Sequence, residues 1–303
     1  SGQNLVLNEL DVKENITNSY YSILTNEHTL KIISENLNNL KEIEQHTKNM
    51  YLAGVMEETD VDQIKITVSQ LINTQKSLER MKILSYNLFK FQLGIAPEDE
   101  IMLADTLEQL IASIDLQQSA KSEFEITSNI SYQLIESQAL LAKKQLDMQW
   151  WDFAPNIAGF YSYTEKFKTT GIDFSPNHVG GITFSWPLFS SGGRLLKVSQ
   201  AKINLDIAKR NQEMVKDQLA LQEKQLLFNY QSALENYATQ KENVTIAERV
   251  YKSIQNKYQQ GVASSLDLTQ ANSNFLTAEN NYLSAVLTLL QSHTALQKLH
   301  NTL

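Results

Sequence analysis

Apolar residues recur at alternating spacings of three and four over long stretches of the chain. The clearest run lies in 268–289, where successive positions are separated by 3, 4, 3, 4, 3 and 4 residues: Leu268, Ala271, Phe275, Ala278, Tyr282, Ala285 and Leu289. A sustained repeat of about 3.5 residues is typical of helices that pack as coiled coils. Because similar spacings run through 12–52, 60–94 and 191–258, we predict long helices at each of these places.

The longest predicted helix covers 191–258. This range contains no proline, and its last glycine is Gly193. As one helix it would be about 100 Å long at roughly 1.5 Å per residue. A helix of that length suits a structure that spans a cellular compartment.

Two short segments interrupt the helical pattern, and both have the same spacing. YLAGVMEETDVDQ (51–63) and YQQGVASSLDLTQ (258–270) agree at positions offset by 207, which is 258 minus 51. The agreeing positions are Tyr51, Gly54, Val55, Asp60 and Gln63 in the first segment, and Tyr258, Gly261, Val262, Asp267 and Gln270 in the second. We infer an internal duplication in which Gly54 ends one helix in a left-handed conformation and Asp60 is the N-cap of the next.

The middle of the chain has a different periodicity. The ranges 155–167 and 179–189 are rich in aromatic and β-branched residues, and apolar and polar side chains alternate around Ile182 and Phe184. This period of two predicts an amphipathic β-hairpin. Each strand has about the ten residues that a tilted membrane strand needs. An interfacial aromatic belt could be supplied by Trp150, Trp151, Tyr161, Tyr163 and Trp186.

The segment between the first helical pair and the hairpin is less regular. Pro97 and the acidic run 98–100 predict a short irregular stretch. After it, 101–116 is compatible with a strand or short helix followed by a helix, and 120–149 with a further helix.

Composition and charge narrow the possible functions. The net charge is −8 with no basic stripe, which argues against nucleic-acid binding. The chain has no cysteine and no apolar run of 18 residues, so it has neither a thiolate site nor a transmembrane helix. No metal-binding spacing relates the histidines, which are His28, His46, His178, His293 and His300. We therefore expect no catalytic residue, no metal and no cofactor.

Several motifs, in this order, resemble the TolC-like outer membrane efflux proteins. WPLFSSGGRLLKVSQAKINLDIAK (186–209) resembles the family's passage from strand to helix, and DFAPNIAGFYSY (152–163) resembles its third strand. The segment 258–285 resembles its second helix-turn-helix. YYSILTNEHTL (20–30) and MYLAGVMEETDVDQIKITV (50–68) resemble its first helical pair.

The resemblance implies a mainly α fold: long antiparallel coiled-coil helices form the protomer of an α-barrel, and one amphipathic β-hairpin joins a trimeric transmembrane β-barrel. The offset of 207 places the counterpart of the hairpin before residue 1, so we expect an N-terminally shortened chain. The implied partners are two further copies of the chain, a periplasmic adaptor (membrane fusion) protein, an inner-membrane pump and outer membrane lipid.

On this basis we predict four regions. They are a first periplasmic helical pair (1–94, tip turn 53–60), an equatorial segment plus helix (95–150), the β-hairpin of the outer membrane barrel (151–190) and a second periplasmic helical pair (191–303, tip turn 259–267).

The implied function is that of an outer membrane export duct in a tripartite efflux or type I secretion system of a Gram-negative bacterium. Such a protein is a passive conduit, not an enzyme, and would be gated at the periplasmic helical tip. The tip and gate residues would be Tyr51, Gly54, Glu57, Glu58, Asp60, Asp62, Tyr258, Gly261 and Asp267. In a trimer the acidic residues would form rings that favour cations. The alternative for Asp60 and Asp267 is a capping role alone.

The hairpin separates the duct from its main alternative, a soluble coiled-coil scaffold or adaptor. In the duct, Ile182, Phe184 and Trp186 face lipid, whereas Thr183 and Ser185 face the lumen. In the scaffold, the hairpin packs its apolar face against helices of the same molecule. Apolar side chains left exposed on the hairpin would therefore favour the duct.

Overall fold

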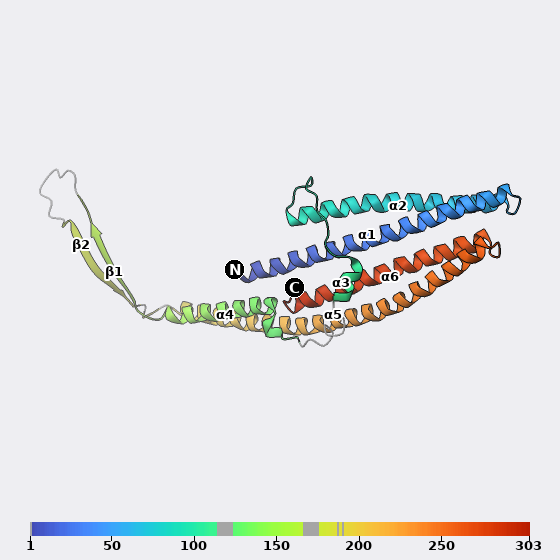
Figure 1. The fold of residues 1–303 in the computed structure, drawn as a ribbon. Coiled ribbons are helices and arrows are strands. Elements are labelled where there is room, and N and C mark those ends of the chain that lie inside the picture. Colours follow the sequence, from blue (N-terminus) through green and yellow to red (C-terminus); the bar gives the residue numbers. More distant parts are fainter. Residues whose placement is uncertain (1, 114–123, 166–175, 187, 190) are drawn as a thin grey trace. The chain divides into compact units, whose positions relative to one another are not determined.

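The computed structural model describes residues 2–113, 124–165, 176–186, 188–189 and 191–303. Its elements are α1 (Gly2–Leu52), α2 (Glu58–Leu93), α3 (Leu107–Ser113), a 3-10 turn (Ile126–Ser128), α4 (Ile130–Trp151), β1 (Asn156–Tyr163), β2 (His178–Ser185), α5 (Gly193–Gln259) and α6 (Ser265–Leu299) (Figure 1). The predicted fold class, long helices with one β-hairpin, is confirmed.

The chain divides into two compact units. The first comprises 1–129 and 220–303, and the second comprises 130–219. In the first unit α1 lies beside α2, and the C-terminal part of α5 lies beside α6 (Figure 1). Within the part of the chain that the structure describes, no helix has an apolar stretch long enough to cross a membrane.

The core of the first unit follows the predicted seams. In one cluster, α1, α2 and α6 meet at Leu40, Ile64 and Leu268, whose side chains are all completely buried. A second cluster joins α3, α5 and α6 around Leu107 and Tyr230. Full burial of an aliphatic side chain is worth about 1.5–3 kcal/mol, so these seams supply much of the packing energy of the helices.

Two asparagines lie inside this apolar core. Asn36 of α1 and Asn272 of α6 are 3% and 1% exposed, and Nδ2 of Asn36 donates a hydrogen bond to Oδ1 of Asn272 at 2.7 Å. Buried amides need such partners because their desolvation is otherwise uncompensated.

The helix boundaries differ from the sequence prediction in two places. Helix α1 already begins at Gly2, not at residue 12. Helix α4 begins at Ile130, whereas we predicted a start near 120; residues 120–123 lie outside the described residues. Residues 126–128 form a 3-10 turn, and Nδ2 of Asn129 donates to the carbonyl of Leu299 at 2.8 Å, which ties this stretch to the end of α6.

The hairpin has a regular antiparallel register. Phe184 is opposite Ile157, Ile182 is opposite Gly159, and the remaining residues alternate between the two faces. One face therefore carries Ile157, Gly159, Tyr161 and Tyr163 with His178, Gly180, Ile182 and Phe184. The other carries Asn156, Ala158, Phe160 and Ser162 with Val179, Gly181, Thr183 and Ser185.

Candidate functional site: the paired turns and the hairpin

The turn between α1 and α2 ends the first helix with a left-handed glycine. Gly54 has φ of 74°, its amide donates to the carbonyl of Tyr51 at 2.9 Å, and the amide of Val55 donates to the carbonyl of Met50 at 2.9 Å. These two bonds define a Schellman motif. A side chain at Gly54 would meet no neighbouring atom, so the backbone angle alone explains the glycine.

The turn between α5 and α6 repeats this geometry. Gly261 also has φ of 74°. Its amide donates to Tyr258 at 2.9 Å, and the amide of Val262 donates to Lys257 at 2.8 Å. The duplication inferred from the sequence therefore extends to the individual backbone hydrogen bonds, and the predicted left-handed cap at Gly54 is confirmed.

The predicted N-cap role of Asp60 is wrong. Glu57 is the N-cap of α2, and Asp60 is the third residue of the helix, where its Oδ2 accepts from the amide of Glu57 at 3.3 Å. Asp267 has the same place in α6, where Ser264 is the N-cap. A carboxylate at this position reaches back to the cap, and it also meets the positive end of the helix dipole.

Ser264 and Asp267 form a complete capping box. The amide of Asp267 donates to Oγ of Ser264, and the amide of Ser264 donates to Oδ2 of Asp267, both at 3.1 Å. The Ser264 hydroxyl also donates to Oδ2 at 2.7 Å. Together, the side-chain and backbone hydrogen bonds from Ser264 lower the pKa of Asp267, so this carboxylate stays charged.

Asp60 also connects the two turns. The hydroxyl of Ser265, at the start of α6, donates to Oδ1 of Asp60 at 2.5 Å. Ser265 is 7% exposed, so this bond is shielded from solvent. One carboxylate thus supports its own helix through Oδ2 and holds the neighbouring turn through Oδ1.

The two matching tyrosines have different surroundings. Tyr258 is completely buried, and its hydroxyl lies 2.7 Å from Oγ1 of Thr47, which links α5 to α1. Tyr51 is 39% exposed. Tyr258 therefore connects the two helical pairs within one chain, whereas Tyr51 lies at the surface.

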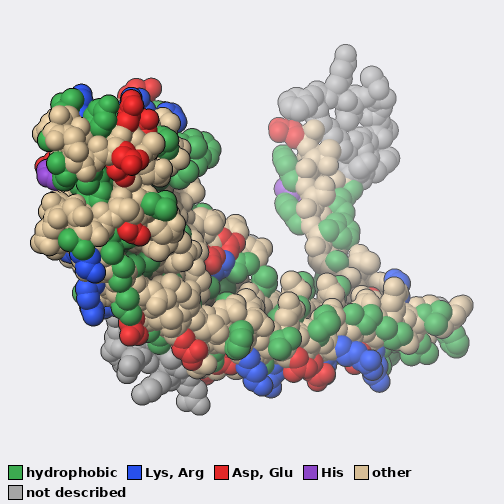
Figure 2. Space-filling model, turned by 90° about the vertical axis from the view of Figure 1, so that its right-hand side faces the viewer, with side chains coloured by type: hydrophobic (Ala, Val, Ile, Leu, Met, Phe, Trp, Pro, Cys, Tyr) green, Lys and Arg blue, Asp and Glu red, His purple; other side chains and the backbone are tan. Residues whose placement is uncertain are grey.

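Most of the predicted acidic residues lie on the surface of the turns. Glu57, Glu58, Asp62 and Asp267 are exposed, and Asp60 is half-buried. Figure 2 looks onto the end of the first unit that carries the turns, and acidic side chains (red) appear there. The turns therefore present negative charge outward.

The hairpin leaves its apolar side chains uncovered. Ile182 is 81% exposed, Phe184 61% and Trp186 55%. Trp186 lies just beyond the end of β2 at Ser185. Figure 2 shows hydrophobic side chains (green) along the described part of the hairpin. On the hairpin face that carries Ile182 and Phe184, the hydroxyl of Tyr161 lies 2.6 Å from Nδ1 of His178.

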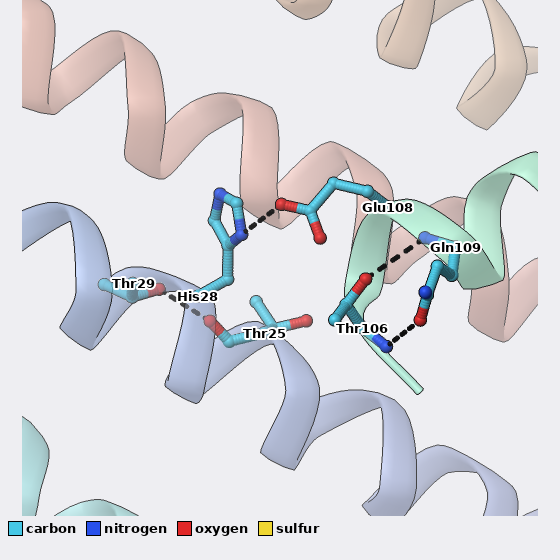
Figure 3. A network of polar contacts seen from close by, with 6 residues as sticks. All are labelled: Thr25, His28, Thr29, Thr106, Glu108 and Gln109. Carbon is cyan, nitrogen blue, oxygen red and sulfur yellow. Dashed lines mark hydrogen bonds and ion pairs between the residues drawn. The ribbon is translucent and has the colours of Figure 1, made fainter. Parts of the chain in front are cut away.

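A polar network that the sequence did not reveal holds the segment around α3 against α1 (Figure 3). Nδ1 of His28 lies 2.9 Å from Oε1 of Glu108, and the hydroxyl of Tyr20 donates to Oδ2 of Asp105 at 2.8 Å. Leu107, between these two acids, is 3% exposed. The contacts are structural in character, and no motif marks them because the partners are about 80 residues apart.

No cluster of side chains in the described ranges has the composition of a metal site, that is, three or more His, Cys, Asp or Glu. The turns and the hairpin consist of backbone caps, contacts between helices and an exposed apolar strand face.

The family model of the outer membrane efflux proteins matches residues 138–302, which is more than half of the chain. No curated protein sequence matches. The fold is similar to VceC, an outer membrane protein of Vibrio cholerae, with a TM-score of 0.75 and 17% identity over 99% of this chain and 72% of VceC.

Two further solved structures have the same fold. The MtrE outer membrane channel of Neisseria gonorrhoeae, in its open state, gives a TM-score of 0.77 with 15% identity over 98% of this chain and 67% of MtrE. CusC was solved in structures that concern conformational changes accompanying folding and transmembrane channel formation. It gives a TM-score of 0.80 with 14% identity over 98% of this chain and 70% of CusC.

The fold is thus that of an outer membrane channel protomer. The chain belongs to the outer membrane efflux protein family, which confirms the resemblance seen in the sequence. It is an efflux channel protein of the outer membrane.

Proposed function

We propose that three copies of this chain form an export duct that is closed at the paired turns and anchored by the hairpin in the outer membrane. The observation that carries the proposal is the hairpin face around Ile182 and Phe184, which is apolar and exposed in the single chain. A face of this kind needs lipid or protein to cover it. Lipid fits because the opposite face carries mainly small and polar residues, as a water-filled lumen requires.

The predicted regions have these places in the proposed duct. The helical pairs 1–94 and 191–303 form the periplasmic wall, with tip turns 53–60 and 259–267. The equatorial segment and helix comprise 95–150, and 151–190 is the membrane hairpin. The partners are a periplasmic adaptor and an inner-membrane pump that supplies the energy. The duct itself needs no cofactor and carries out no catalytic step.

The hydrogen bond from Ser265 to Asp60 supports a gate at the tip. It ties the two turns of one chain together, and Tyr258 ties the same helical pairs through Thr47. An opening that separates the two helical pairs has to break both contacts. The exposed acids Glu57 and Asp267 would form rings in the trimer, which favour cations over anions.

The orientation of the hairpin can be tested with two neighbouring substitutions. Ile182→Lys places a charge on the proposed lipid face, and Thr183→Lys places the same charge on the proposed lumen face. A lysine facing the bilayer midplane costs about 2–4 kcal/mol, and less near the interface. We expect Ile182→Lys to reduce insertion into vesicles and Thr183→Lys to leave it nearly unchanged. Equal loss in both variants would contradict the orientation.

The assembly itself is tested by light scattering in detergent and by conductance in planar bilayers. We expect a trimer with low conductance, and Ser265→Ala should raise the open fraction because Asp60 loses its contact with the neighbouring turn. Ser273→Ala, an exposed serine two turns further along α6, is the matched control. Monomers in detergent, together with no conductance in planar bilayers, would instead support a scaffold with a packed hairpin.

A further inference from the structure

A cleft lies at the base of the hairpin, where the strands meet the ends of two helices. It has about 700 Å³ of space and collects side chains from the end of α4, both strands and the first turns of α5. Its polar and aromatic lining includes Trp151, Asp152, Asn156, Ser185, Arg194 and Lys197. The lining also includes Ile157 of the proposed lipid face, whereas Asn156 and Ser185 belong to the opposite face, so the cleft reaches both sides of the hairpin at its base.

The cleft has a net positive charge. Arg194 and Lys197 contribute two cations and Asp152 one carboxylate. The guanidinium of Arg194 lies over the ring of Phe153, 5.9 Å from its centroid, which holds the charged group near the cleft. The first turn of α5 contains no acidic residue. The N-terminus of this helix is the positive end of the helix dipole, so it makes the potential in the cleft more positive.

This charge contrasts with the rest of the molecule. The unit 130–219 has 10 basic and 8 acidic residues, a net charge of +2, whereas the remaining residues have 16 basic and 26 acidic, a net charge of −10. The basic excess is therefore confined to the unit that carries the hairpin. Unlike the turns, this unit can attract anions.

Exposed apolar side chains lie next to the cleft along the chain. Trp151 is 76% exposed, Trp186 55%, Leu188 72% and Phe189 99%. Arg194 follows Phe189 by five positions. Apolar strand, tryptophan and cation thus follow one another in the order found where a protein leaves the hydrocarbon core and passes the headgroups of a bilayer.

We infer that this cleft binds the phosphodiester headgroup of an anionic phospholipid. The two cations pair with the phosphate, Trp151 lies at the level of the headgroup, and Leu188 and Phe189 contact the acyl chains. Asp152 reduces the positive charge to that of one net cation, which matches a headgroup with a single negative charge. The inference rests on the proposed function, because it requires the hairpin to lie in a membrane.

The test is flotation of the full chain with two kinds of vesicle at moderate salt. One kind is pure phosphatidylcholine, and the other contains phosphatidylglycerol as one third of its lipid. We expect binding to both, with a preference for the anionic vesicles. Arg194→Gln with Lys197→Gln should lower the ratio of the two binding constants by roughly tenfold and leave binding to phosphatidylcholine nearly unchanged.

Two controls make this test specific. Lys209→Gln with Arg210→Gln removes the same charges from exposed positions of α5 outside the cleft and should lower the ratio much less. Asp152→Asn should raise the ratio, because it removes the carboxylate from the cleft. A variant that only disturbed the fold would not change the ratio in this direction.

The outcomes separate the inference from the function on which it rests. No binding to either vesicle would overturn the membrane hairpin and the headgroup site with it. Binding to both vesicles with an unchanged ratio in the double variant would overturn the headgroup site alone. Binding of inorganic phosphate to the chain without vesicles, together with no preference for the anionic vesicles, would identify a free-anion site and likewise overturn the lipid assignment.

Discussion

The hydrogen bond between Tyr258 and Thr47 lets us predict how three variants rank in their free energy of unfolding. Both residues are completely buried, and their hydroxyl oxygens are 2.7 Å apart. Thr47 also donates to the carbonyl of Ile43 at 2.8 Å, whereas the other polar neighbour of the Tyr258 hydroxyl is the Met56 sulfur at 3.6 Å. Thr47 therefore keeps a good hydrogen bond when Tyr258 loses its hydroxyl, whereas Tyr258 does not when Thr47 loses its hydroxyl.

The magnitudes follow from this asymmetry. Tyr258→Phe removes one net hydrogen bond but leaves Thr47 bonded to Ile43, so we expect a loss of about 1 kcal/mol in the free energy of unfolding. Thr47→Val leaves the phenol with only a weak sulfur acceptor in a buried site, at a cost of about 1–3 kcal/mol. The double variant has no polar group left to satisfy there, so it should be more stable than Thr47→Val alone.

Urea unfolding of the purified chain, followed by circular dichroism at 222 nm, measures these differences as shifts of the midpoint at constant slope. Tyr51→Phe is the matched control, because Tyr51 has the equivalent place in the first turn but is 39% exposed. Its effect should stay below about 0.5 kcal/mol. The reasoning is refuted if Tyr51→Phe costs as much as Tyr258→Phe, or if the double variant is less stable than Thr47→Val.

Other substitutions probe the turns, the half-buried Glu279 and the buried His293. Gly261→Ala, at φ of 74°, should lower the free energy of unfolding by about 1 kcal/mol, and Gly54→Ala should do the same, both measured by urea unfolding. Burial and then the charge of Glu248 raise the pKa of Glu279 to about 7. The folded chain thus holds this proton to higher pH than the unfolded chain, and stability should fall as pH rises from about 4.5 to about 7; Glu279→Gln should remove that slope in unfolding at a series of pH values. Burial lowers the pKa of His293, so its contribution has the opposite sign: stability is lost as pH falls below 6.5, and His293→Phe should abolish this loss.

The helical architecture could be predicted because its signal is local and repeated. The spacing of Ile33, Leu37 and Leu40 marks one seam, and all three side chains are buried in the structure. The role of the turn glycines could be predicted equally well, because a glycine between two long helical segments indicates a left-handed helix cap. The alternation around Ile182 and Phe184 correctly indicated a two-faced hairpin.

The details of the turns were harder to predict. Aspartate is common both at the N-cap and at the third position of a helix. The spacing from the preceding glycine does not tell these two positions apart. Ser264-x-x-Asp267 is itself a capping-box signature, which could have corrected the second turn. The contact between Asp60 and Ser265 could not be foreseen, because it joins residues 205 positions apart and depends on how the helices pack.

The buried asparagine pair in the core determines how the helices align lengthwise. A seam of apolar residues looks alike after every seven residues, so one helical pair could slide along the other by about 10 Å and still bury its apolar side chains. Such a shift would separate Asn36 from Asn272 and leave both amides buried without each other, at about 1–3 kcal/mol for each group. The pair thus selects one alignment during folding. That alignment brings the two turns level, so that Ser265 reaches Asp60.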